Sequence, residues 1–136
     1  MLISDLYKYL ITSRQLPATS GQEGTIEATV TVNRESAVYR GHFPGFAITP
    51  GVCQVLMIQE ILEGALNIRL RLSGAKSIKF TAMHEPDKAG EIQARISYTR
   101  DGSRLTVEGM LFKETTTYLK FKGAFIEQSE AIQGGV

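Results

Sequence analysis

One loop of the sequence concentrates the residues that could do chemistry. Residues 41–51 read GHFPGFAITPG and place His42 among three glycines and two prolines. An imidazole titrates near neutrality and can serve as a general base. Pro44 and Pro50 each fix their own φ at about −65° and force the preceding residue into an extended conformation. Such a stiff loop fits either a catalytic histidine or a histidine that caps a neighbouring carbonyl, and the residues alone leave both open.

The end of this loop has the features of a helix start. Thr49 followed by Pro50 is typical of an N-cap and a first helical residue, which predicts a helix from Pro50. Gly51 would then lie in the first turn, where a backbone N–H has no acceptor within the helix and faces the positive end of the dipole. Glycine has no side chain to shield that N–H. A base and an amide suited to a developing oxyanion are therefore expected at the same loop.

The elements that must position these groups follow from periodicity. Residues 52–66, VCQVLMIQEILEGAL, are apolar almost all round and predict a buried helix. Residues 25–33 alternate apolar and polar side chains, which indicates a half-buried strand. Residues 3–12 could begin as a short helix before a strand, and 19–24 and 100–104 are turns by composition. Four further runs are strand-like: about 68–80, 91–100, 104–114 and 118–127.

One buried helix and about five long strands predict an α+β fold, in which an antiparallel sheet wraps around a central helix. The whole chain, residues 1–136, fits one domain, and residues 128–136 are expected to be a flexible tail. A curved sheet leaves one side of such a helix open. We therefore expect a dimer to close it.

Composition excludes several function classes. The 136 residues carry a net charge of +1, which argues against nucleic acid as the main partner. The sequence has no apolar tract of about 20 residues, so no membrane span is predicted, and the opening residues make a poor secretion signal. The single cysteine, Cys53, fits a reducing cytoplasm. One cysteine and two histidines make no metal-binding set, so we predict neither a metal nor another cofactor.

The loop followed by a buried helix resembles the FabA/FabZ-type 3-hydroxyacyl-[acyl carrier protein] dehydratases, which have the hot-dog fold. The family pattern begins Gly-His-Phe-Pro-Gly and ends Pro-Gly at the helix start, which residues 41–45 and 50–51 match. Ala47 stands where the family has a proline, and Thr49 where it has a methionine. Residues 118–127, YLKFKGAFIE, also resemble the closing strand of that family.

The resemblance implies a reversible dehydration of a 3-hydroxyacyl thioester to the trans-2-enoyl thioester. By position, His42 would remove the C2 proton and the Gly51 N–H would bind the thioester carbonyl. The resemblance also implies a substrate tunnel lined by Phe43, Pro50, Val52, Cys53 and Leu56. The setting would be fatty-acid or aryl-polyene/flexirubin-type biosynthesis. The implied partners are an acyl carrier protein, a second copy or higher oligomer of dimers, and a hetero-partner dehydratase subunit.

The chain departs from this family at one functional position. The family places an acid fourteen residues after the histidine, where this sequence has Leu56. Glu60, one turn further along the helix, is one substitute, and Gln54 could orient a water or the substrate hydroxyl. A residue of a partner chain is a third. Glu60 and Glu63 would otherwise simply be solvated at the far end of the helix.

Other residues leave two interpretations each. Cys53 is either a thiol activated by the helix start or a small buried side chain. His84 lies in a turn-rich stretch and is predicted to be on the surface. Four cations follow the helix and form either a rim that steers an acidic carrier protein or the solvated face of a strand: Arg69, Arg71, Lys76 and Lys79. Four apolar residues of the helix line either a tunnel or the core: Met57, Ile58, Ile61 and Leu62.

The missing acid keeps two other functions open. A thioesterase of the same fold would direct water at the carbonyl and release a free thiol. A non-catalytic acyl-binding partner subunit would perform no reaction, although it would have no need of a titrating group in so stiff a loop.

Overall fold

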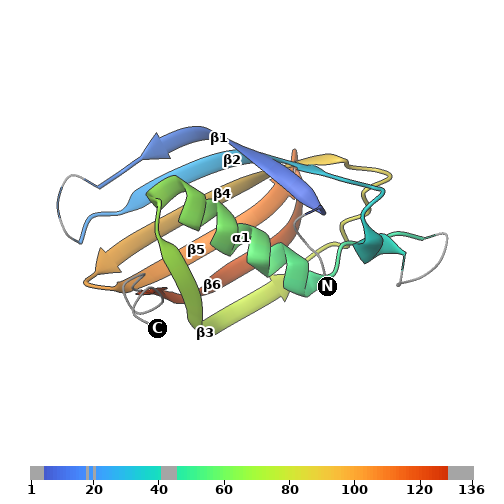
Figure 1. The fold of residues 1–136 in the computed structure, drawn as a ribbon. Helices are drawn as coiled ribbons and strands as arrows, with labels where there is room; N and C mark the ends of the chain where they lie inside the picture. The colour runs from blue at the N-terminus through green and yellow to red at the C-terminus, as the bar shows by residue number, and fades with distance from the viewer. Residues whose placement is uncertain (1–4, 18, 20, 41–45, 129–136) are drawn as a thin grey trace.

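A computed structural model describes the chain except for residues 1–4, 18, 20, 41–45 and 129–136. Within that part, six strands form one antiparallel sheet in the order β1-β2-β4-β5-β6-β3, and one long helix packs against it (Figure 1). The elements in chain order are β1 (Tyr7–Gln15), β2 (Gly24–Val32), the 3-10 helix η1 (Ala37–Tyr39), α1 (Gly51–Leu66), β3 (Arg69–Phe80), β4 (Glu91–Asp101), β5 (Arg104–Lys113) and β6 (Thr116–Gln128). The predicted α+β architecture is confirmed.

In the strand β2, the alternation of apolar and polar residues places the apolar side chains in the core. Ile26, Ala28 and Val30 are completely buried, whereas Glu27 and Thr29 between them lie on the opposite face. β2 pairs with β1 on one side and with β4 on the other. The alternation therefore places one apolar row against the helix, as predicted.

The strand predicted near the start of the chain is present. Tyr7–Gln15 forms an edge strand that pairs with β2 along almost its full length, whereas the short helix expected before it falls mainly on residues 1–4, which lie outside the described residues. Tyr7, Tyr9 and Ile11 lie half-buried against the core.

The helix begins one residue later than predicted. Pro50 is the N-cap, with φ −61° and ψ 146°, and Gly51 is the first helical residue. Thr49 cannot serve as the cap because its hydroxyl is bonded elsewhere. At the other end, Asn67 adopts the left-handed conformation with φ 55°, and its N–H bonds to the Glu63 carbonyl, which ends the helix.

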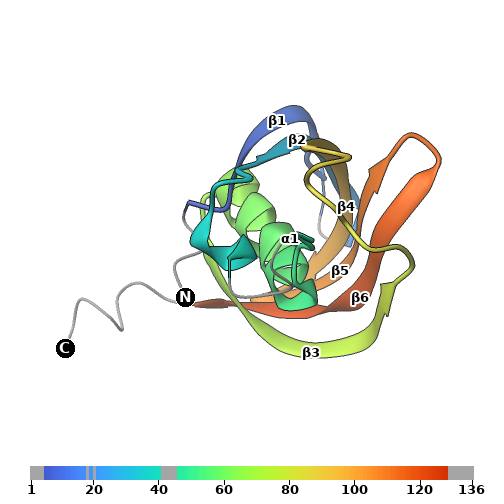
Figure 2. The same ribbon diagram turned by 90° about the vertical axis from the view of Figure 1, so that its right-hand side faces the viewer.

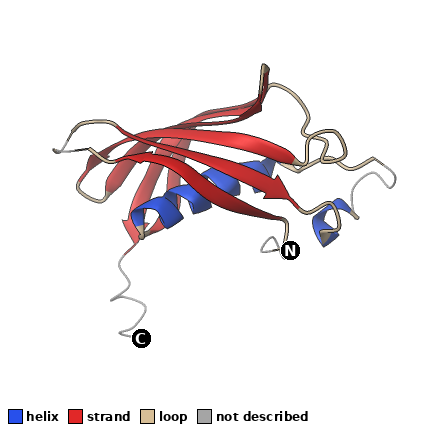
Figure 3. Ribbon diagram, turned by 90° about the horizontal axis from the view of Figure 1, so that it is seen from above, coloured by secondary structure: helices blue, strands red, loops and turns tan. Residues whose placement is uncertain are grey.

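The sheet curls around α1 but leaves one side of it uncovered. Seen along the helix, the edge strands β1 and β3 lie on opposite sides of it (Figure 2). Seen from above, the sheet covers the helix from one direction only (Figure 3). Val52, on the uncovered side, is 59% exposed. No helix in the described part of the chain has the length and apolar character that crossing a bilayer requires.

Candidate functional site

The candidate site is the start of α1, where the sequence predicts an oxyanion-binding amide. Gly51 is the first residue of the helix, and its N–H has no acceptor among the described residues. The first intrahelical bonds run from the N–H groups of Cys53 and Gln54 to the Pro50 carbonyl. The Gly51 amide therefore has the free N–H expected of a first-turn residue.

Phe80 at the end of β3 gives a second reason for glycine at position 51. A Cβ on Gly51 would lie 2.5 Å from the Cζ atom of Phe80, too close for two carbon atoms. The Phe80 ring therefore lies beside the helix start, and the residue is 52% exposed. Glycine here thus permits a close contact as well as leaving an amide unshielded.

A buried chain of hydrogen bonds holds the residue just before the helix. The hydroxyl of Thr49 lies 2.8 Å from the Tyr39 hydroxyl and 2.7 Å from Nδ1 of His84. Nε2 of His84 lies 2.7 Å from the carbonyl oxygen of Ala89. A carbonyl can only accept, so the proton of the neutral ring is on Nε2. The chain then has one direction: Tyr39 donates to Thr49, Thr49 donates to Nδ1, and Nε2 donates to Ala89.

This arrangement corrects the prediction that His84 is on the surface. His84 is 1% exposed, and the ring of Tyr118 packs edge-on against it with the centroids 5.0 Å apart. Burial lowers the pKa of His84, although the Ala89 carbonyl and the Glu85 carboxylate act in the other direction. His84 is accordingly neutral and serves as a link between the β3–β4 connection and the helix start.

Thr49 is also held through its backbone, and this contact involves Gln54. The Thr49 N–H donates to the His84 carbonyl at 2.9 Å, and the Gln54 side-chain amide donates to the Thr49 carbonyl at 3.2 Å. The other end of that side chain, Oε1 of Gln54, is buried and has no hydrogen-bond partner among the described residues. Gln54 is 3% exposed. An unpaired buried acceptor is costly, so this oxygen is ready to receive a donor.

The two glutamates of the helix are engaged away from its start. The Tyr7 hydroxyl of β1 donates to the Glu60 carboxylate, and burial together with that carboxylate raises the pKa of Tyr7. Glu60 lies nine residues beyond Gly51, which is about 13 Å along the helix axis. Glu63 accepts from the Leu70 N–H at 2.8 Å and so anchors the beginning of β3.

The residues predicted to line a tunnel have different surroundings. Cys53 is buried, and burial raises the pKa of its thiol, opposite to the lowering expected for a helix start. Val52 is exposed, and Pro50 and Leu56 are half-buried. The sequence allowed four apolar helix residues to line either a tunnel or the core. All four are completely buried in the core: Met57, Ile58, Ile61 and Leu62.

The predicted base lies outside the described residues. His42 and Phe43 fall in the segment 41–45, so their roles stay predictions. Within the described ranges, no group of three histidine, cysteine, aspartate or glutamate side chains could hold a metal ion.

Comparison with known proteins identifies relatives of the chain. A family model described as ApeI-like, ApeI dehydratase, matches residues 18–122. No curated protein is similar enough in sequence to count as a relative. The family match supports the expected dehydratase family in a general form, although under a description other than FabA/FabZ.

Solved structures share the fold. The dehydratase heterocomplex ApeI:P from Xenorhabdus doucetiae is 22% identical, with a TM-score of 0.56, over 88% of this chain and 98% of that chain. A hypothetical thioesterase from Streptococcus pneumoniae, solved with coenzyme A, is 12% identical, with a TM-score of 0.60, over 94% of this chain and 91% of that chain. Likeness at these identities shows the hot-dog fold and nothing finer.

Proposed function

Because the chain belongs to the ApeI-like dehydratase family, we propose that it removes water from a 3-hydroxyacyl thioester carried on an acyl carrier protein. The product is the trans-2-enoyl thioester. The family match carries this proposal, and the free N–H of Gly51 at the helix start supports it. The pathway is fatty-acid or aryl-polyene/flexirubin-type biosynthesis. The buried free thiol of Cys53 is in keeping with a reducing cytoplasm.

In the proposed reaction, His42 removes the C2 proton and the electron pair moves toward the thioester carbonyl. The Gly51 N–H donates to that carbonyl oxygen as negative charge develops on it. The C2–C3 double bond then forms and the C3–O bond breaks. The leaving hydroxyl needs a proton, which Leu56 cannot supply. The imidazolium of His42 returns the proton that it removed, and water leaves.

Gln54 is the residue that we propose in place of the missing acid, as a group that orients rather than ionises. Its unpaired Oε1 can accept a hydrogen bond from the 3-hydroxyl group and hold it toward the histidine. The amide end of the same side chain is already fixed on the Thr49 carbonyl. Glu60 is the weaker candidate because Tyr7 occupies its carboxylate.

A second hot-dog chain is the partner that we propose for the uncovered side. Three apolar side chains of the edge strand β3 point to the helix side of the sheet, since each pairs with a core residue of β6, yet each is at least 40% exposed: Leu72, Ile78 and Phe80. Val52 adds to this apolar surface. The second chain is either another copy or a related subunit, as in the ApeI:P heterocomplex of Xenorhabdus doucetiae.

The opposite face of β3 supports a carrier protein as the bearer of the substrate. Its cations are all exposed: Arg69, Arg71, Lys76 and Lys79. An acyl carrier protein is acidic, so a row of cations would speed its approach.

One incubation separates the proposed function from its two alternatives. With a 3-hydroxyacyl thioester, a dehydratase yields an enoyl product that absorbs in the ultraviolet, whereas a thioesterase releases a free thiol. A non-catalytic subunit yields neither product alone. Light scattering on the same sample gives the oligomeric state, and a monomer would contradict a second copy as the partner and leave the related subunit.

A further inference from the structure

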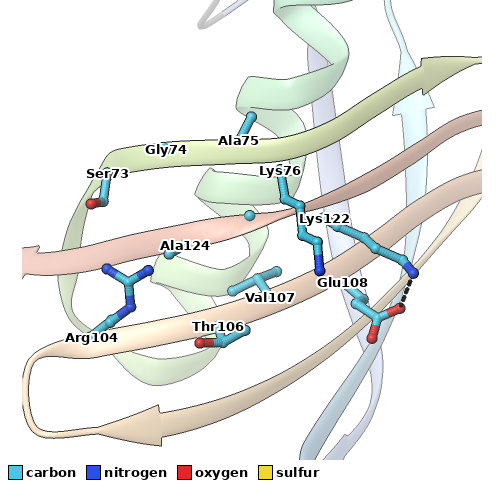
Figure 4. Close-up of a pocket in the computed structure, with 11 residues that line it drawn as sticks. Ser73, Gly74, Ala75, Lys76, Arg104, Thr106, Val107, Glu108, Lys122 and Ala124 are labelled. Carbon is cyan, nitrogen blue, oxygen red and sulfur yellow. Dashed lines mark ion pairs between the residues drawn. The ribbon is translucent and has the colours of Figure 1, made fainter.

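A pocket of about 470 Å³ opens on the outer face of the sheet, away from α1 (Figure 4). It crosses the strands β3, β5 and β6, and no residue of the candidate site lines it. Outward-facing side chains of β5 and β6 and a bent part of β3 form its wall. None of the groups that would carry out the proposed dehydration lines this pocket, although Lys76 also belongs to the row of cations proposed to meet the carrier protein.

The pocket is hollow because glycines and alanines form its floor and because the pairing of β3 is irregular there. Gly74, Ala75, Gly123 and Ala124 contribute almost no side chain. A Cβ on Gly123 would lie 2.6 Å from the Gly74 carbonyl oxygen, so the two strands approach too closely for any larger residue. The pairing of β3 with β6 shifts register twice in this region, between residues 72 and 74 and between 75 and 77.

The pocket is lined by more positively charged side chains than negatively charged ones. Lys76, Arg104 and Lys122 line the pocket, and Glu108 is the one acid that does so. Glu108 lies 3.8 Å from the ammonium group of Lys122, as the dashed line in Figure 4 marks. Lys76 and Arg104 have no ion-pair or hydrogen-bond partner among the described residues. They reach over the floor from opposite strands (Figure 4).

Two further lysines on the same face of β3 and β6 add to the excess of positive charge. Lys79 of β3 stands directly opposite Lys120 of β6. Like charges at paired positions of a sheet repel and lower stability. An arrangement that keeps cations together at this cost indicates an anionic ligand rather than a solvated surface alone.

We propose that this pocket binds a phosphomonoester. Three cations and one acid leave two uncompensated positive charges, which match the charge of about −1.5 to −2 on a phosphate monoester near neutral pH. The guanidinium of Arg104 can bind two phosphate oxygens side by side, and Lys76 adds a point charge. The hydroxyls of Ser73 and Thr106 line the same pocket and can donate to the remaining oxygen.

A titration with inorganic phosphate, followed by amide chemical shifts of ¹⁵N-labelled protein at constant ionic strength, tests this proposal. Saturable shifts are expected for residues 73–76, 104–108 and 122–124. The double variant Lys76→Gln/Arg104→Gln should bind phosphate at least about tenfold more weakly, since each charged hydrogen bond contributes on the order of a factor of ten. Both side chains are exposed, so the variant should keep the wild-type spectrum elsewhere.

The matched control is Lys8→Gln/Arg14→Gln, which removes one lysine and one arginine from exposed positions of β1. It should bind phosphate as the wild type does. Shifts that never saturate, or equal weakening in both double variants, would overturn the proposal. The titration contains no thioester, so its failure and a failure of the dehydration assay are separate results.

Binding of two nucleotides then shows which kind of molecule carries the phosphate. Coenzyme A carries a 3′-phosphomonoester and dephospho-coenzyme A lacks it. Tighter binding of coenzyme A, lost in Lys76→Gln/Arg104→Gln, would identify a nucleotide-borne monoester. Equal binding of the two, with inorganic phosphate still saturating the pocket, would identify free phosphate as the ligand.

Discussion

Replacing Thr49 with valine tests whether the buried hydrogen-bond chain holds the start of α1. Valine keeps the shape of the side chain but leaves the Tyr39 hydroxyl without an acceptor and Nδ1 of His84 without a donor. Both partners are at most 3% exposed, so water cannot replace the lost bonds. Each buried polar group left unpaired costs about 1–3 kcal/mol, and the two together should lower the free energy of unfolding by about 2–6 kcal/mol.

Urea unfolding at pH 8, followed by circular dichroism, measures this loss. Thr49→Ser is the matched control because it keeps the hydroxyl and removes only a methyl group, which contributes about 1 kcal/mol when buried. The expected order of stability is wild type, then serine, then valine. If valine and serine lose the same amount, or valine stays within about 0.5 kcal/mol of the wild type, the hydroxyl does not hold the helix start.

Three further predictions follow from buried or crowded groups. Burial lowers the folded-state pKa of His84 below its ordinary value of 6.5, so the stability from neutral His84 is present above pH 6.5 and is lost as the pH falls through the folded pKa. Urea unfolding at pH 8 and pH 5 should therefore show a smaller loss for His84→Gln than for the wild type, and equal losses would count against this. Tyr7→Phe should cost about 1 kcal/mol by removing the donor to Glu60. It should also remove a late-ionising tyrosine from an alkaline ultraviolet titration, since the pKa of Tyr7 is raised, and the loss of a tyrosine that ionises in the ordinary range would refute the pairing. Gly123→Ala should lower the free energy of unfolding by roughly 1–3 kcal/mol, because its Cβ meets the Gly74 carbonyl, whereas Gly74→Ala, which meets nothing, should change it by less than about 0.5 kcal/mol. Similar effects of the two alanines would contradict the packing.

The fold could be predicted because its signals are local. Alternation in residues 25–33 marks one strand, and the apolar run after Gly51 marks the central helix. The glycine and proline pattern of residues 41–51 points to the dehydratase family without any long-range information. Each of these features is readable within about fifteen residues of sequence.

The details that sequence could not supply depend on distant contacts. His84 reads as a surface residue because its partner, Thr49, lies 35 positions earlier in the chain. Of the two interpretations of Cys53, the small buried side chain agrees with the structure, in which burial raises the pKa of the thiol. The unpaired oxygen of Gln54 shows only when its surroundings are known, although an amide on the apolar side of a helix is a signal for it.

The initial rate of 2-enoyl formation from a 3-hydroxyacyl thioester, compared between the wild type and His42→Ala, tests the central claim most directly. We expect the wild type to form the enoyl product and the alanine variant to be slower by about 10²–10⁴-fold, the usual contribution of a general base. Both proteins should give the same unfolding curve. Equal rates, or a wild type that releases free thiol and no enoyl product, would contradict the account.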